Sequence, residues 1–263
     1  MIAKKTCAEV WPLILIYLVV MELILLPAIY YWPDVYDFSL KSSIPIRLPD
    51  FGQRILDAIS DSNSDVAYRH YFAIQVFIKG ANICGMAMAT VLGTCFIARE
   101  RENQTLEFLL ARPVSRARIM FAKCWVMEVG LVVPIFLVAW SGKPLSMWML
   151  EEDLPLWPIT AGAIHSSLFV TVFFMITCLC SVLFRTQTHT AATAGVFAVL
   201  QATLYLIPNI RSASMFKLAD LDVYGPMIMG NTPDFIGNMQ ISMAVGAVLL
   251  YLITAAVFRR INL

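Results

Sequence analysis

The sequence is poor in charged residues, and this shortage excludes a soluble fold. Only 14% of its residues are Asp, Glu, Lys or Arg, whereas 59% are hydrophobic, and the mean hydropathy is +0.74. Soluble domains carry about 25% charged residues, because their surfaces face water. A chain of 263 residues with this composition lacks the polar residues for such a surface. A lipid bilayer, in contrast, solvates an apolar exterior.

Motifs of the common hydrolases and nucleotide-binding enzymes are also missing. The sequence contains no GxxxxGK[ST] loop, no HExxH pair and no GxSxG turn, so it offers no recognisable phosphate cradle, zinc site or activated serine. His165 lies beside Ser166 and Ser167 in an apolar run, but no second histidine accompanies it there. Catalysis by this histidine would require a nucleophile or metal ligands within reach. We therefore expect a protein that is not an enzyme, with an intramembrane hydrolase as an alternative.

The six cysteines form no recognisable disulfide or metal framework. All of them fall within apolar runs or beside the basic ends of those runs: Cys7, Cys84, Cys95, Cys124, Cys178 and Cys180. None lies in a segment expected outside the membrane, where oxidising conditions favour disulfides. Sulfur ligands from these cysteines and the 14 methionines would suit copper(I), but such residues also serve as ordinary apolar packing. We expect free thiols, and no metal or cofactor bound by this chain.

Long apolar runs dominate what the sequence does contain. A helix of about 20 apolar residues crosses the ~30 Å hydrocarbon core of a bilayer. Six runs of this kind predict membrane spans at Val10–Tyr31, Tyr71–Ile97, Ile119–Trp140, Leu156–Phe184, Ala191–Pro208 and Met239–Phe258. The first run is too long for the core of a signal peptide, so we expect it to remain as a span. The predicted fold is an all-α polytopic membrane protein with six transmembrane helices in a single domain, residues 1–263.

Basic and acidic residues lie at opposite ends of the predicted spans. Basic residues gather on one side: Lys4, Lys5, Arg99, Arg101, Arg112, Arg116, Arg118, Lys123, Arg185, Arg259 and Arg260. Carboxylates gather on the other: Asp34, Asp37, Asp50, Asp57, Asp61, Asp65, Glu151, Glu152, Asp153, Asp220, Asp222 and Asp234. Because Lys and Arg favour the cytoplasmic side, an even number of spans places both termini in the cytoplasm. We expect a multi-pass protein of the cell membrane, either a bacterial inner membrane or a plasma membrane.

Two segments on the acidic side are long enough to fold outside the membrane. Residues 33–70 contain an amphipathic stretch, Phe51–Ile59, which predicts a short helix. Residues 209–238 contain Pro226 and Pro233, which interrupt any long helix. We therefore expect short elements rather than further spans in both segments.

The basic segment Arg99–Lys123, between the second and third spans, has the pattern of a short amphipathic helix. Leu106, Leu109 and Leu110 are spaced i, i+3 and i+4, so they share one helical face. Asn103 is a suitable N-cap for this helix, since its side-chain oxygen can accept from otherwise unpaired amides. We expect this helix to lie across the inner face of the membrane.

The same segment contains a helix stop followed by a new helix start. Arg112 precedes Pro113 and is therefore disfavoured in the α conformation, whereas Ser115 can cap a second helix that continues into the third span. The first helix would then be a lever with both ends fixed to spans. Basic amphipathic helices also rest on membrane surfaces, which is the alternative interpretation. Glutamates interleaved with the arginines favour a protein partner instead: Glu100, Glu102 and Glu107.

Glu102–Arg116 reads E-x-x-T-L-E-x-L-L-x-x-P-V-S-R, and this motif resembles the cytoplasmic loop of ABC-2-type permeases. These permeases are the membrane subunits of one class of ABC transporters. The expected six spans, internal termini and loop position agree with that family. The family often has Gly before T-L-E and Gly-Lys at the start of the third span, where this chain has Gln104 and Ala122-Lys123. Glycine at these positions supplies backbone freedom rather than a chemical group.

The resemblance implies an energy-coupling role. In the family, this segment forms a coupling helix that sits in a cleft of a separate ATP-binding subunit, which binds ATP and Mg²⁺ and hydrolyses the nucleotide. The residues that we assign to ATPase coupling are Glu100, Glu102, Thr105, Leu106, Glu107, Leu109, Leu110, Arg112, Pro113, Ser115 and Arg116.

The resemblance also implies the partners of the chain. They are two copies of an ABC ATP-binding subunit, a second copy of the permease in a homodimer, and membrane lipids, with no nucleic acid. The implied activity is export. A membrane scaffold or assembly factor, which binds a cytoplasmic partner without transport, is the alternative function.

Two acidic residues lie within predicted spans. Glu22 falls near the middle of the first span and Glu128 falls inside the third. Ionisable groups at such depth are costly, so they usually face the bundle interior or pair with another group. We expect Glu22 to line a pathway or to pair with Lys79 of the second span, with a structural hydrogen bond as the alternative. For Glu128 we expect a side chain that reaches the inner interface.

Overall fold

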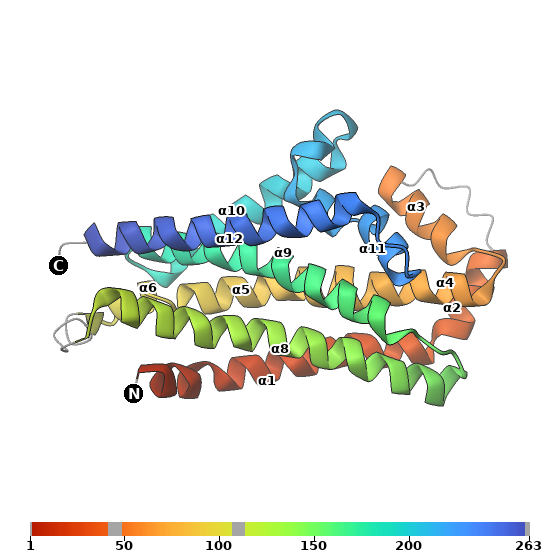
Figure 1. Cartoon of the computed structure of the whole chain (residues 1–263), viewed down its shortest axis with the longest axis horizontal. Helices are drawn as coiled ribbons and strands as arrows, with labels where there is room; N and C mark the ends of the chain where they lie inside the picture. Colours follow the sequence, from red (N-terminus) through yellow and green to blue (C-terminus); the bar gives the residue numbers. More distant parts are fainter. Residues whose placement is uncertain (1, 42–48, 107–113, 261–263) are drawn as a thin grey trace.

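The computed structural model describes residues 2–41, 49–106 and 114–260, and within these ranges the chain forms helices and no strands. The helices, shown in Figure 1, are α1 (Ile2–Tyr30), α2 (Trp32–Lys41), α3 (Asp50–Ile59), α4 (Ser64–Ala73), the π-helix η1 (Ile74–Cys84), α5 (Gly85–Thr94), α6 (Ala98–Glu102), α8 (Arg116–Leu150), α9 (Leu156–Leu183), α10 (Gln187–Leu206), the 3₁₀ helices η2 (Pro208–Ala213) and η3 (Met215–Ala219), α11 (Leu221–Ile228) and α12 (Asp234–Arg260). The all-α fold class is therefore confirmed.

Five helical segments in the described part of the chain are long and apolar enough to cross a membrane. They are Ala3–Tyr30, Ser64–Glu102, Arg116–Leu150, Leu156–Leu183 and Asp234–Arg260. Each one coincides with a predicted span, although two of the predicted spans extend one residue beyond the helix. The chain is thus a multi-pass membrane protein.

The predicted span Ala191–Pro208 corresponds to α10, which is not among these five segments. Helix α10 has 20 residues, enough to match the hydrocarbon core at about 1.5 Å per residue. Its sequence, QTHTAATAGVFAVLQATLYL, is diluted by Thr, Gln and Ala, which lowers its hydropathy relative to the other long helices. The sixth span therefore stays a prediction.

Helix α9 lies at the centre of the bundle. It packs against α5, α8, α10, α11 and α12, while α1 packs along α8 on the outer side. Large side chains fill the space between these helices, including Phe169 and Phe173 of α9, Phe77 of η1 and Met21 of α1, all of them buried. The core therefore runs along the bundle as one continuous apolar cluster.

The two ends of the bundle carry different elements (Figure 1). Helix α6, the start of α1, the start of α8 and the end of α12 lie at one end, which we call the α6 end. Helices α2, α3 and α11 and the start of α4 lie at the other, which we call the α3 end. The first and last described residues of the chain therefore lie at the same end of the bundle.

The amphipathic stretch predicted at Phe51–Ile59 is confirmed as helix α3, Asp50–Ile59. It turns the half-buried side chains of Ile55, Ala58 and Ile59 towards the main core. The opposite face of α3 is polar and remains available for charged contacts with the segment between α10 and α12. The amphipathic pattern thus folds this outer helix back onto the spans.

A π-helix of 11 residues interrupts the second span, and nothing in the sequence predicts it. Its hydrogen bonds run from residue i to i+5 rather than i+4, which widens the helix. Residues about four and five positions apart consequently share a face. Ile78, Asn82 and Ile83 are related in this way, and they line one cavity described below.

Glycine allows α5 and α9 to approach closely. A Cβ atom at Gly93 would lie 2.4 Å from Thr177 Cγ2 and 2.7 Å from Thr177 Cβ. Contacts this short force the two helices apart. By contrast, a Cβ atom at Gly246 of α12 would meet nothing within 4 Å.

We expect Gly93→Ala to destabilise the protein by about 1–3 kcal/mol, the range typical of overpacking in a filled core. Gly246→Ala is the matched control, and it should leave stability unchanged or slightly raised because alanine favours helix. Thermal unfolding of both variants in the same detergent measures the difference. Equal melting temperatures for the two variants would contradict the close α5–α9 contact.

Candidate coupling site

The turn that leads into α6 is fastened to the end of α9. The hydroxyl of Ser181 accepts from the backbone amides of Ile97 and Ala98, at 3.0 Å and 2.9 Å. Arg101 donates from Nη1 to the carbonyl of Val182 at 2.8 Å. A single buried serine thus accepts from two amides at the start of α6, where a helix leaves its first amides without intrahelical partners, and α6 is held against the last turn of α9.

A buried ion pair joins α6 to α8. Lys123 Nζ lies 2.9 Å from Glu100 Oε1, and the two residues are only 3% and 6% exposed. Lys123 also donates to the carbonyl of Phe96 at 2.9 Å, and the hydroxyl of Thr105 donates to Glu100 Oε2 at 2.5 Å. Lys5 of α1 approaches the same carboxylate at 3.9 Å. Both charges are therefore paired and hydrogen-bonded, as burial requires.

Glu102 connects α6 to the beginning of α10. Its Oε2 atom accepts from the backbone amide of Gln187 at 3.0 Å and from the Gln187 side chain at 3.1 Å. The first amides of a helix lack intrahelical partners and carry partial positive charge, so a carboxylate is favourable there. Glu102 therefore caps α10 from a neighbouring element.

The other flank of the segment is fastened to α12. Ser115 caps α8, accepting from the amide of Arg118 at 3.3 Å, so this sequence prediction is confirmed. Arg116 donates from Nη1 to the carbonyl of Arg259 at 3.2 Å and to that of Phe258 at 3.4 Å. Cations near a helix C-terminus satisfy its free carbonyls. Residues 107–113 thus lie between two anchors that contact α1, α8, α9, α10 and α12.

The residues assigned to coupling fall into three groups. Glu100 and Leu106 are buried and Thr105 is half-buried. Glu102 and Ser115 are exposed and Arg116 is half-buried, all with the contacts described above. The remaining members lie outside the described residues: Glu107, Leu109, Leu110, Arg112 and Pro113. Glu100 and Thr105 are hydrogen-bonded to each other within the protein.

The prediction that Asn103 caps a new helix is wrong. Asn103 follows α6 as its C-cap, and its amide donates to the carbonyl of Arg99 at 3.0 Å. The next residue, Gln104, has a φ of +56°, which turns the chain before Thr105 and Leu106. The sequence pattern did not reveal α6, because ARERE has no apolar periodicity.

Gln104 occupies a backbone conformation that glycine adopts more easily. The left-handed region costs a residue with a Cβ atom about 1–2 kcal/mol. Gln104 is also the position at which the resemblance noted above often has glycine. The structure thus explains why a residue without a side chain suits this turn.

The expected Glu22–Lys79 pair is not formed. Glu22 accepts from the hydroxyl of Ser141 at 3.0 Å, whereas Lys79 is exposed, and no ion pair within 4 Å joins them in the described chain. Glu128 accepts from Thr171 of α9 rather than reaching the interface, and its Oε2 atom is buried with no hydrogen-bond partner among the described residues. Both glutamates therefore bond to a neighbouring hydroxyl inside the bundle.

The residues considered for catalysis are engaged elsewhere. His165 Nε2 lies 2.7 Å from the carbonyl of Leu218, and Ser166 is paired with the hydroxyl of Tyr224 at 2.7 Å. The Ser167 hydroxyl donates to the carbonyl of Ala163. Across the described ranges, no group of three or more His, Cys, Asp or Glu side chains is placed to hold a metal ion. The interior thus offers hydrogen-bonded packing rather than an activated nucleophile.

A second charged cluster lies at the α3 end. Asp220 is 1% exposed, and three cations surround it: Arg211 at 2.7 Å, Lys217 at 3.0 Å and Arg54 at 3.4 Å. The hydroxyl of Tyr205 donates to its other oxygen at 2.9 Å. Asp220 therefore ties α3 and the end of α10 to the start of α11.

Neighbouring Asp222 extends this cluster to its exposed side. Partial burial opposes ionisation of its carboxyl, but hydrogen bonds from Lys217 and Arg54, both 2.6 Å long, outweigh that cost and hold its pKa below the usual value. The same contacts raise the pKa of Lys217 against the effect of burial. The carboxylate of Asp222 and the ammonium of Lys217 therefore remain charged at neutral pH.

Sequence reasoning missed several of these residues. Helix α6 is held in place by Ser181, Gln187 and Lys123. Of these, only Lys123 stood out in the sequence, as the last residue of the basic segment Arg99–Lys123. Arg54 and Asp220 are 166 positions apart in the sequence. Local patterns cannot connect residues at such a separation.

A bundle of membrane-spanning helices, with a basic segment at one end, defines a multi-pass membrane protein. A family model described as ABC-2 family transporter protein matches residues 51–226, well over half of the chain. The chain therefore belongs to the ABC-2 family of transporter proteins. The match extends from α3 to α11 and includes α6 and its contacts with α8, α9 and α10. Comparison with curated protein sequences finds no significant match.

Lys123→Met is expected to destabilise the protein by about 3–5 kcal/mol, because it leaves the Glu100 carboxylate buried without its main partner. The double variant Glu100→Leu/Lys123→Met should recover most of this loss, since neither charge is then buried. Lys4→Met, at an exposed position near the same end, is the control and should be neutral. Thermal unfolding of purified protein distinguishes the variants, and a double variant no more stable than Lys123→Met would argue against the buried pair.

The stability of Gln104 variants should follow how readily each residue adopts a positive φ. Gln104→Gly removes the Cβ strain and is expected to be as stable as the wild type or up to about 1 kcal/mol more stable. Gln104→Val should be the least stable of the three, because a β-branched side chain tolerates a positive φ poorly. Melting temperatures give the ranking directly. A valine variant as stable as the glycine variant would be incompatible with the left-handed turn.

Proposed function

We propose that this chain is the membrane-spanning permease subunit of an ATP-driven exporter, and that residues 99–123 couple it to a separate ATPase subunit. Membership of the ABC-2 family supports the permease role. The observation that carries the coupling role is the anchoring of the described residues on either side of 107–113, which are bonded to five helices of the bundle.

Such anchoring suits the transmission of movement. A network in which every polar group has a hydrogen-bond partner is rigid. The residues on either side of 107–113 therefore move with the helices that hold them. A partner that displaces the segment would therefore act on α8 and α12 through Arg116, and on α9 and α10 through Arg101 and Glu102. This arrangement converts a local movement at the α6 end into a rearrangement of the spans.

In this proposal the α6 end faces the cytoplasm, in agreement with its basic residues. Helix α10 is the sixth span, because α9 ends at the α6 end and α12 begins at the α3 end, so α10 must return the chain between them. Two copies of the permease form a homodimer and bind two ATPase subunits, which hold ATP and Mg²⁺. The substrate moves as the helices alternate between arrangements.

Charge reversal within the segment tests the coupling role. We expect Glu107→Arg to abolish co-purification with a co-expressed ABC ATPase subunit, and with it the stimulation of ATPase activity by the permease. Glu9→Arg is the matched control, because it makes the same charge change at an exposed position near the same end. Pull-down and ATPase rates, with melting temperatures as a check on folding, measure the effect.

The outcomes separate the competing functions. If Glu107→Arg assembles and stimulates ATPase activity as the wild type does, the coupling proposal is wrong. If the wild type binds the ATPase subunit but never changes its rate of ATP hydrolysis, a scaffold describes the chain better than a transporter.

A further inference from the structure

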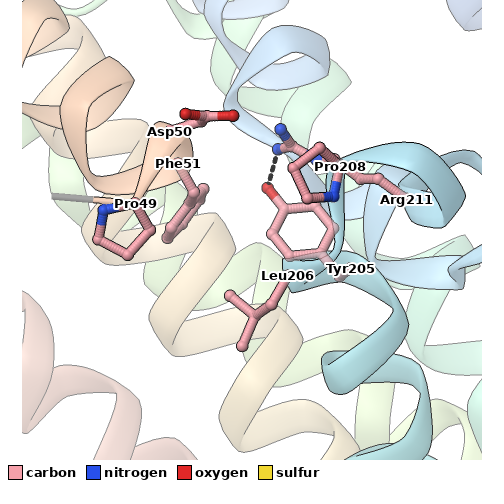
Figure 2. Close-up of a pocket in the computed structure, with 7 residues that line it drawn as sticks. All are labelled: Pro49, Asp50, Phe51, Tyr205, Leu206, Pro208 and Arg211. Carbon is pink, nitrogen blue, oxygen red and sulfur yellow. Dashed lines mark hydrogen bonds between the residues drawn. The ribbon is translucent and has the colours of Figure 1, made fainter.

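Two adjoining cavities lie at the α3 end, between α3, η1 and α10. The outer cavity has a volume of about 390 Å³, and the inner one about 200 Å³. Phe51, Tyr205 and Leu206 line both of them, so the two cavities share a wall, and we refer to them together as the groove. Figure 2 shows the residues that line the outer cavity, where the rings of Phe51 and Tyr205 pack edge to face with their centroids 5.6 Å apart.

The inner cavity is apolar and extends along the helices. Ile78 and Ile83 of η1 and Ala202 of α10 form its walls, and the amide of Asn82 is turned away to donate to Tyr224 at 2.9 Å. Since η1 leads away from the α3 end and α10 leads towards it, Ile83 and Ala202 lie deeper in the bundle than Leu206. Ile83 is 52% exposed and Leu206 64% exposed, so the groove opens to the lipid-facing surface.

The outer cavity is polar at its mouth. Arg211 lies over the ring of Tyr205, with its Cζ atom 4.2 Å from the ring centroid, and its Nη2 atom donates to Asp220 at 2.7 Å. Its Nε atom is buried and has no hydrogen-bond partner among the described residues. Asp50, in the first turn of α3, stands near Arg211 at this mouth and is exposed (Figure 2). The mouth of the groove is thus lined by one guanidinium group and one carboxylate, beside an apolar slot.

The charges around the mouth are balanced. The cations are Arg54, Arg211 and Lys217, and the carboxylates are Asp50, Asp220 and Asp222. An anionic head group would be attracted by Arg211 but repelled by Asp50. A head group that carries both charges pairs with the two residues at once. An apolar chain fits the inner cavity, which contains no group to hydrogen-bond a polar ligand.

From this arrangement we propose that the groove binds a phospholipid with a zwitterionic head group. Its phosphate accepts from the guanidinium of Arg211, its ammonium lies beside the carboxylate of Asp50, and one acyl chain occupies the inner cavity along Ile83 and Ala202. The lipid stands head outwards, as it does in the leaflet at that end. The site is at the opposite end from the coupling segment and does not depend on the proposed transport function.

Binding is tested on the delipidated full-length protein by native mass spectrometry. The probes are lysophosphatidylethanolamine, lysophosphatidylglycerol and monoacylglycerol with the same acyl chain. We expect one site at which the zwitterionic probe binds about tenfold more tightly than the anionic or the uncharged probe. Equal binding of all three probes would overturn the assignment of the head group.

Two variants locate the site. Ala202→Phe fills the inner cavity and should weaken binding of the zwitterionic probe about tenfold, whereas Val199→Phe, at a 67% exposed position of the same helix outside the cavity, should leave binding unchanged. Asp50 is exposed, and the Asp50→Asn variant should lose the preference for the zwitterionic over the anionic probe. If Ala202→Phe binds as tightly as Val199→Phe, or if Asp50→Asn keeps the preference, the lipid is bound elsewhere and the proposal fails.

Discussion

The buried pair between Lys123 and Glu100 is the contact on which the α6 end depends. Neither charge reaches water, so each requires the other and the hydrogen bonds from Thr105 and to Phe96. These contacts hold the short helix α6 against the first turns of α8. The same contacts help to fasten the described residues on either side of 107–113 to five helices of the bundle.

The α3 end is organised by the same physical constraint. Asp220 is buried, and its charge gathers Arg54, Arg211 and Lys217 from segments far apart in the sequence. These contacts hold the outer helix α3 and the chain between α10 and α12 against the spans. In both cases one desolvated carboxylate orders a segment that lies outside the apolar core. Between the two ends, neutral hydrogen bonds such as Tyr224 with Asn82 and Ser166 satisfy the polar groups of the bundle.

Much of the architecture could be predicted because it depends on local hydropathy. Five of the six predicted spans, helix α3 and the cap at Ser115 follow from apolar runs, amphipathic spacing and one residue type at a helix start. The family motif at Glu102–Arg116 was recognisable for the same reason, since it is contiguous. Helix α10 did not reach the hydropathy of a span because its sequence is rich in Thr, Gln and Ala.

The errors concern contacts between distant residues and backbone detail. Asn103 ends a helix instead of starting one, Glu22 bonds to Ser141 instead of Lys79, and the π-helix at Ile74–Cys84 left no trace in the residue pattern. The sequence by itself determined that the chain is helical, that it crosses a membrane repeatedly, and which segment carries the family motif, because each depends on neighbouring residues. Only the tertiary structure decided which charges are buried together, how helix α6 is held against the spans and where cavities remain. Those features arise from packing between helices, and the energy of a buried charge or an unfilled space depends on side chains that the sequence places far apart.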